Sequence, residues 1–148
     1  MQKTELEEIL EPIQGNQRVQ MMKQFIQHGK TSTFQHCRSV AETCDWLNER
    51  FRLGADRRAL ITAAMLHDFY LYDWHCADDG SHRRHGFYHA RRARDNAIRE
   101  FAVDTRIQSA IDSHMWPLNP LRIPSSREAW ILWVADKIET FREMRVKP

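Results

Sequence analysis

The chain has 148 residues, of which 42% are hydrophobic and 28% are charged, a balance that is ordinary for a globular protein and excludes a disordered one. Its 22 lysines and arginines barely outnumber its 20 acidic residues, and this formal charge of +2 argues against a dedicated nucleic-acid binder. Three cysteines without a CxxC pair favour reduced thiols in the cytoplasm, and the longest strictly apolar run, residues 129–135, is too short to cross a membrane.

Helix signals follow one another through the first half of the chain. A capping box at residues 4–7 predicts a short first helix, and a second helix is expected over 16–28. A long third helix is expected to begin at a cap at residues 32–33 and to end at Gly54, and Asp56 can cap a fourth helix. The third helix has an apolar stripe that consists of Cys37, Val40, Ala41, Cys44, Leu47 and Phe51.

Helix signals continue in the second half. The polar residues 72–84 predict a loop, after which a fifth helix carries His89 on its apolar side. Asp104 caps a sixth helix, prolines within 117–124 mark a second loop, and a capping box at residues 125–128 begins the last helix. No stretch alternates with a period of two for long enough to predict a strand.

These elements predict an all-α fold, a single-domain bundle of about six to seven helices over residues 1–148. The core of the domain is expected over about 33–137, with the N-terminal helices of 4–28 packed on it. None of the three cysteines has a nearby His–Asp partner arrangement in the sequence, so a thiol nucleophile is not expected. Cys37 and Cys44 are expected in the core.

Acidic and imidazole side chains recur beside the apolar faces of these helices, about one helix–turn–helix step apart. They are His36, the adjacent pair His67 and Asp68, His89, His114 and Asp136. Asp136 lies within AWILWVADKI, where a buried carboxylate is costly unless it is paired or bound to a metal. Helices packed around one core can each deliver one such ligand to a shared centre. A mixed set of His and Asp suits one or two divalent ions of Fe, Mn, Zn, Co or Ni better than Ca or Mg.

The order of these residues resembles the H…HD…D signature of the HD-domain superfamily of metal-dependent phosphohydrolases. His36, His67–Asp68 and Asp136 match the signature, and His89 in HGFYHA and His114 in IDSHMWPL look like the two extra histidines of its binuclear members. The resemblance spans roughly residues 33–137 and implies a bundle of about five core helices. It also implies that the four signature residues hold a first ion, and that Asp68 bridges to a second ion held by His89 and His114.

The activity implied by this resemblance is hydrolysis of a phosphoester of a nucleotide or other small metabolite by a metal-activated water, which Asp68 and Asp136 would orient. Leu71 occupies the place where some members carry a catalytic Glu or Lys, and the GYP signature of cyclic-dinucleotide phosphodiesterases is missing. Cyclic-dinucleotide hydrolysis is therefore not expected, and the general acid is left open between Asp73 and His75.

The segment HRRHGFYHARRAR, residues 82–94, combines histidines with arginines, whose planar forks suit phosphate. We expect its His89 to be the ligand and Arg84 and Arg92 to contact the substrate. His85 is expected to contact either a metal ligand or the substrate. For Lys137 the sequence leaves two roles open, a contact with a substrate phosphate and an ion pair with a surface carboxylate.

Two other functions remain open from the sequence. One is a di-iron oxygenase of the kind that shares the HD bundle, acting on a small polar substrate. The other is a metal-containing binding module without turnover. The expected partner is a phosphorylated small molecule, membrane and nucleic acid are not expected, and the sequence is compatible with a homodimer.

Overall fold

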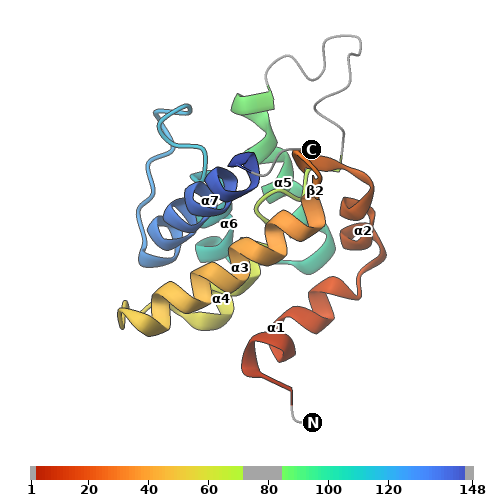
Figure 1. The fold of residues 1–148 in the computed structure, drawn as a ribbon. Coiled ribbons are helices and arrows are strands. Elements are labelled where there is room, and N and C mark those ends of the chain that lie inside the picture. Colours follow the sequence, from red (N-terminus) through yellow and green to blue (C-terminus); the bar gives the residue numbers. More distant parts are fainter. Residues whose placement is uncertain (1–2, 72–84, 146–148) are drawn as a thin grey trace.

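The computed structural model of the chain describes residues 3–71 and 85–145, without the side chains of 85–87. The described part is helical apart from one short hairpin, which confirms the all-α prediction (Figure 1). None of its helices is long and apolar enough to cross a membrane. In chain order the elements are α1 (Glu5–Gln14), α2 (Gln17–Gln20), the 3₁₀ helix η1 (Met21–Gln24), β1 (Ile26–His28), β2 (Thr31–Ser32), α3 (Thr33–Arg50), α4 (Arg57–Leu66), α5 (His85–Phe101), α6 (Thr105–Asp112) and α7 (Arg127–Arg145).

The starts of most helices are where the capping residues predict them. The cap side chains accept hydrogen bonds from the first turn of α1, α3, α4 and α6, and they belong to Thr4, Ser32, Asp56 and Asp104. The predicted capping box of α7 is wrong by one residue, because Ser126, and not Ser125, accepts from the Ala129 amide at 3.0 Å. Glu128 does not complete the box, since its carboxylate accepts from the Asp56 amide at 2.9 Å and so joins α7 to α4.

The predicted helix over 16–28 is wrong beyond Gln24. Asn16 caps the short α2, but the backbone becomes extended at Phe25, and β1 then pairs antiparallel with β2 around Gly29, which has a φ of 56°. The expectation of no strand is therefore also wrong. The hairpin places the Gln27 side chain in the interior, where it makes buried hydrogen bonds that a continuing helix would not make.

The core lies between α3, α4 and α7, and α5 and α6 pack beside them. Figure 1 shows α3 and α7 side by side, and α1 packs on α4. Cys37 and Cys44 are fully buried in this core, as predicted, and burial raises the pKa of the Cys44 thiol. Phe51 is not on the apolar stripe, because α3 ends at Arg50 rather than at Gly54 and the Phe51 side chain is 57% exposed.

We expect Leu60→Ala to lower the free energy of unfolding by about 2–5 kcal/mol, because its side chain is completely buried and truncation leaves a cavity. The matched control is Leu121→Ala at a side chain that is 89% exposed, which should change the free energy by less than about 0.5 kcal/mol. Denaturant unfolding of both variants measures the difference. Equal destabilisation by the two substitutions would contradict this placement of the core.

Candidate metal centre

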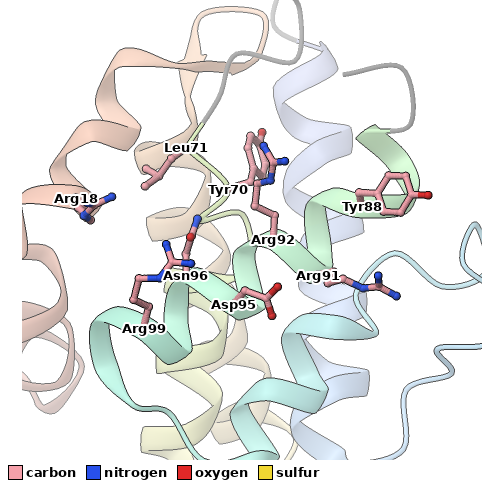
Figure 2. Close-up of a pocket in the computed structure, with 9 residues that line it drawn as sticks. All are labelled: Arg18, Tyr70, Leu71, Tyr88, Arg91, Arg92, Asp95, Asn96 and Arg99. Carbon is pink, nitrogen blue, oxygen red and sulfur yellow. The ribbon is translucent and has the colours of Figure 1, made fainter. Parts of the chain in front are cut away.

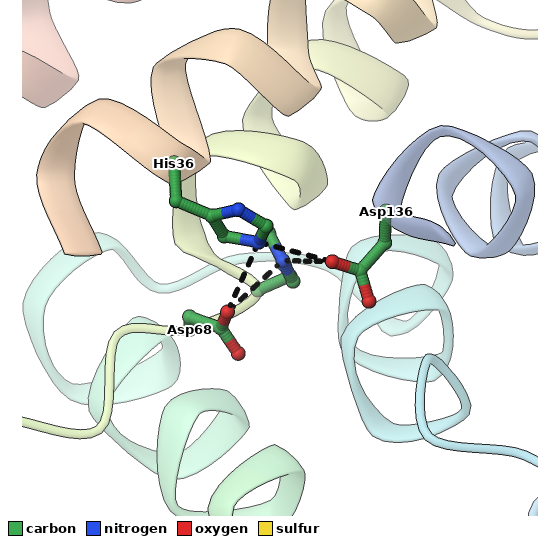
Figure 3. A group of neighbouring side chains, drawn as sticks. His36, Asp68 and Asp136 are labelled. Carbon is green, nitrogen blue, oxygen red and sulfur yellow. Dashed lines mark hydrogen bonds and ion pairs between the residues drawn. The ribbon is translucent and has the colours of Figure 1, made fainter. Parts of the chain in front are cut away.

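The six predicted ligand residues come together at one place in the core. His36 lies on α3, His89 on α5 and Asp136 on α7, while His67–Asp68 and His114 directly follow α4 and α6. Figure 3 shows how His36, Asp68 and Asp136 converge from three of these segments. All six side chains are buried; the most exposed is Asp136, at 6%.

One group of four donor atoms lies between α3, α4 and α7. The Asp136 Oδ1 atom is 3.0 Å from His36 Nε2 and 3.3 Å from His67 Nε2. The Asp68 Oδ2 atom is 3.4 Å from His36 Nε2 and 3.2 Å from His67 Nε2. These four side chains could hold one metal ion.

A second group shares Asp68 with the first. The Asp68 Oδ1 atom lies 3.3 Å from both His89 Nε2 and His114 Nε2, and these two nitrogens are 2.9 Å apart. Oδ1 is buried and has no hydrogen-bond partner among the described residues. Each oxygen of the Asp68 carboxylate thus faces a different set of imidazole nitrogens.

The hydrogen bonds of three histidines fix which ring nitrogen points into the centre. His67 and His114 each place Nδ1 within 2.6–2.7 Å of the backbone carbonyl three residues earlier, and His36 Nδ1 lies 2.8 Å from both oxygens of Glu143. Carbonyl and carboxylate oxygens only accept, so Nδ1–H is the donor in all three rings. Nε2 of each ring is therefore the nitrogen that faces the acidic side chains and that could bind a metal, which is the arrangement of metal-ligating histidines.

The donor atoms fit divalent transition metals. Acceptor atoms repel one another at 2.9–3.4 Å unless a proton or a cation lies between them. Neighbouring ligands at about 2.0–2.1 Å from one ion lie about 3 Å apart, which matches this spacing. Imidazole nitrogens mixed with carboxylate oxygens suit Fe, Mn, Zn, Co or Ni.

Without an ion, protons balance the charge of this centre. Burial alone would lower the pKa of His36, but hydrogen bonds to Asp136 and Glu143 raise it to about 10. Burial alone would raise the pKa of Asp136, but the neighbouring His67 and the hydrogen bond from His36 hold it well below the usual range. A metal ion must therefore displace at least the proton of His36.

We expect the apparent metal affinity to increase with pH through the neutral range. Because the pKa of His36 is raised to about 10, this proton is bound throughout the neutral range and must leave when the metal binds. The apparent affinity therefore rises by about tenfold per pH unit for each proton displaced. Calorimetric titration at pH 6, 7 and 8, in two buffers of different ionisation enthalpy, measures affinity and proton release together. An affinity independent of pH, with no proton released, would contradict the expectation.

Glu143 is a residue of the candidate centre that the sequence analysis missed. It lies seven residues after Asp136 on α7, which puts both residues on the same face of the helix. The helical spacing from Asp136 could therefore have predicted that Glu143 faces the same centre. Its carboxylate holds the His36 ring by the Nδ1–H donor.

Gln27 was also missed, and in this case the sequence carries no signal. Its Nε2 donates to Asp68 Oδ2 at 2.9 Å, and its Oε1 accepts from Thr33 Oγ1 at 3.2 Å and from the Tyr70 hydroxyl at 2.6 Å. The contact depends on the hairpin, which was predicted as helix.

A cavity of about 250 Å³ lies over both groups of ligands. It is lined by Gln27, His28, Asp68, His89, His114, Met115, Asp136, Lys137 and Thr140. The Lys137 side chain is 44% exposed, and its Nζ donates to the His114 carbonyl at 3.3 Å and lies 3.5 Å from Asp136 Oδ2. A cation is thus present at the edge of the cavity.

The other predicted site residues are not among the described residues that line this cavity. Asp73, His75 and Arg84 lie outside the described residues, and for His85 only the backbone is described, in the first turn of α5. Arg92 lines a second cavity (Figure 2) and is not among the residues over the ligand groups.

Comparison with protein families gives one result. The family model of the HD domain matches residues 33–140, close to the span expected from the signature residues, and confirms that resemblance. No curated protein and no solved structure gives a significant match.

Proposed function

This chain belongs to the HD domain family, and we propose that it hydrolyses a phosphoester of a nucleotide or other small metabolite with two divalent metal ions. The family is one of metal-dependent hydrolases, and the proposal adds the substrate class and the number of ions. One observation carries it: both oxygens of the Asp68 carboxylate are directed at separate groups of imidazole nitrogens.

In this proposal, His36, His67, Asp68 and Asp136 hold one ion, and His89 and His114 hold a second ion that Asp68 bridges. Bound ions would lower the pKa of water and neutralise phosphoryl oxygens, which is the chemistry that phosphoester hydrolysis needs. The carboxylates of Asp68 and Asp136 would orient a water molecule, and their position in the lining of the cavity supports this role.

The substrate-facing residues are also proposals. Lys137 would attract a phosphate oxygen at the edge of the cavity, and Asp73 or His75 would protonate the leaving group. Arg84, His85 and Arg92 would contact more distant parts of the substrate.

We expect Lys137→Met to raise the KM for a phosphoester by about tenfold without changing the metal content. The reason is that the variant loses one cation at the cavity and none of the metal ligands. Steady-state kinetics and metal quantification of the same preparation test this. An unchanged KM would place Lys137 only in a structural pairing with Asp136.

The proposed function is tested by metal content and turnover together. The purified protein is analysed for metals and then screened against phosphoesters with added Mn, Co, Ni or Fe, beside the double variant His67→Ala/Asp68→Ala. Metal-dependent release of phosphate by the wild type alone would support the proposal. Full metal and activity in the double variant would overturn it, as would bound iron with oxygen uptake and no phosphate release.

A further inference from the structure

A second cavity, of about 480 Å³, lies between α2, α5 and the segment that follows the HD pair. We call it the arginine pocket. Its lining consists of Arg18, Tyr70, Leu71, Tyr88, Arg91, Arg92, Asp95, Asn96 and Arg99. Figure 2 shows Arg18 across from Arg92 and Arg99 of α5, whereas the Arg91 side chain extends away from these three.

Among the described residues, the lining of the arginine pocket has four guanidinium groups and one carboxylate. That carboxylate, Asp95, is 3.1 Å from Arg94, which is not part of the lining. Arg18 is 3.5 Å from Glu100, whereas Arg91 and Arg99 are exposed and have no ion pair with any described residue. The pocket therefore has positive charge that the described part of the chain leaves uncompensated.

Hydrogen bonds hold the walls of this pocket in place. Asn96 donates to the Phe69 carbonyl at 2.8 Å and so ties α5 to the segment just after Asp68. Asn16, the cap of α2, donates to Glu100 on α5 at 3.3 Å and keeps Arg18 beside that helix. The arginines thus stand on elements that are fixed relative to one another.

We propose that the arginine pocket binds a small anion with two or more phosphate groups. Like charges gathered in one cavity are unfavourable, and an anion removes this cost while accepting paired hydrogen bonds from planar guanidinium groups. Arg91 and Arg99 are separated by about 12 Å along the axis of α5, and in Figure 2 their guanidinium groups point in different directions. A ligand that reaches both needs anionic groups at two places.

The pocket is next to the metal centre but separate from it. Tyr70 lines the pocket, its hydroxyl donates to Gln27, and its ring lies edge-on to the ring of His89 with the centroids 5.5 Å apart. Among the described residues, this layer of side chains lies between the arginine pocket and the residues of the centre. The anion can therefore be a distant phosphate of the substrate, which rests on the proposed function, or a separate ligand, which does not.

The binding test uses tripolyphosphate as the probe and three full-length proteins: the wild type, Arg91→Gln/Arg99→Gln, and a control, Arg50→Gln/Arg58→Gln. Both double variants lose two exposed arginines, but the control positions lie on α3 and α4 outside the arginine pocket. We expect about tenfold or more weaker binding in the pocket variant, wild-type binding in the control, and a rise in Tm with tripolyphosphate that only the pocket variant loses. Equal binding by the two double variants would overturn the proposal, because the probe would then be bound at the metal centre or by net charge.

Kinetics separate the two sources of the anion. If it is part of the substrate, the pocket variant should raise KM about tenfold for phosphoesters with a second phosphate and leave KM unchanged for those with one. If it is a separate ligand, tripolyphosphate should change turnover of a monophosphate ester in the wild type and not in the pocket variant. Absence of phosphoester turnover would count against the proposed function alone, since the binding test needs no reaction.

Discussion

Asp68→Ala is expected to remove metal from both groups and to reduce phosphoester hydrolysis by on the order of 10³-fold or more. Asp68 is the residue shared by the two groups, with Oδ2 near His36 and His67 and Oδ1 near His89 and His114. No other described carboxylate belongs to both groups. Its removal would therefore take a ligand from each of the two proposed ions at once, which no other single substitution in the described groups would do.

The matched comparison is His114→Ala, which leaves all four members of the first group in place. Metal analysis after dialysis should find close to two ions per chain in the wild type, close to one in His114→Ala and none in Asp68→Ala. A chelator should lower the Tm of the wild type and leave that of Asp68→Ala unchanged, because only a protein that binds the ion is stabilised by it. The binuclear proposal would be contradicted if the wild type bound only one ion per chain and His114→Ala still bound that ion in full.

Most of the candidate ligand residues could be found from the sequence because they lie on, or within two residues after, helices with an apolar face. His36 follows the stripe of α3 and Asp136 the inner face of α7, so periodicity alone places them towards the core. Capping side chains such as Asp104 fix where helices begin, since the hydrogen bond is local in sequence. Local rules therefore predicted the helices and the residues that point inward.

Contacts between distant segments could not be predicted in this way. Gln27 reaches Asp68 only because a hairpin replaces the expected helix, and that hairpin is stabilised by buried hydrogen bonds to residues far along the chain. The arginine pocket likewise needs Arg18 of α2 beside α5, a pairing that no periodicity contains. The HRRHGFYHARRAR segment showed the positive charge but not which of its arginines share a cavity.

Glu143→Ala is expected to weaken metal binding by about 10–100-fold, although Glu143 is not one of the proposed ligands. Both oxygens of its carboxylate accept from His36 Nδ1–H at 2.8 Å, and this bond keeps Nε2 directed at Asp136 and Asp68. Without the acceptor, the His36 ring can rotate or take the other tautomer, in which Nε2 is protonated and cannot bind a metal.

A graded pair of variants separates this role from general stability. Glu143→Gln keeps an oxygen that can accept from Nδ1–H but loses the charge, so its affinity should fall less than that of Glu143→Ala, by about tenfold. Glu139→Gln is the control, because Glu139 is similarly buried one turn earlier on α7 but bonds to Thr43 and Arg142 rather than to a histidine. Competition with a metal chelator measures the affinities, and the Nδ1–H proton resonance of His36 reports the tautomer. If Glu143 positions His36, the metal affinity and the Nδ1–H resonance of His36 should change together. A lower Tm in Glu143→Ala with unchanged metal affinity would show instead that the carboxylate only stabilises the fold.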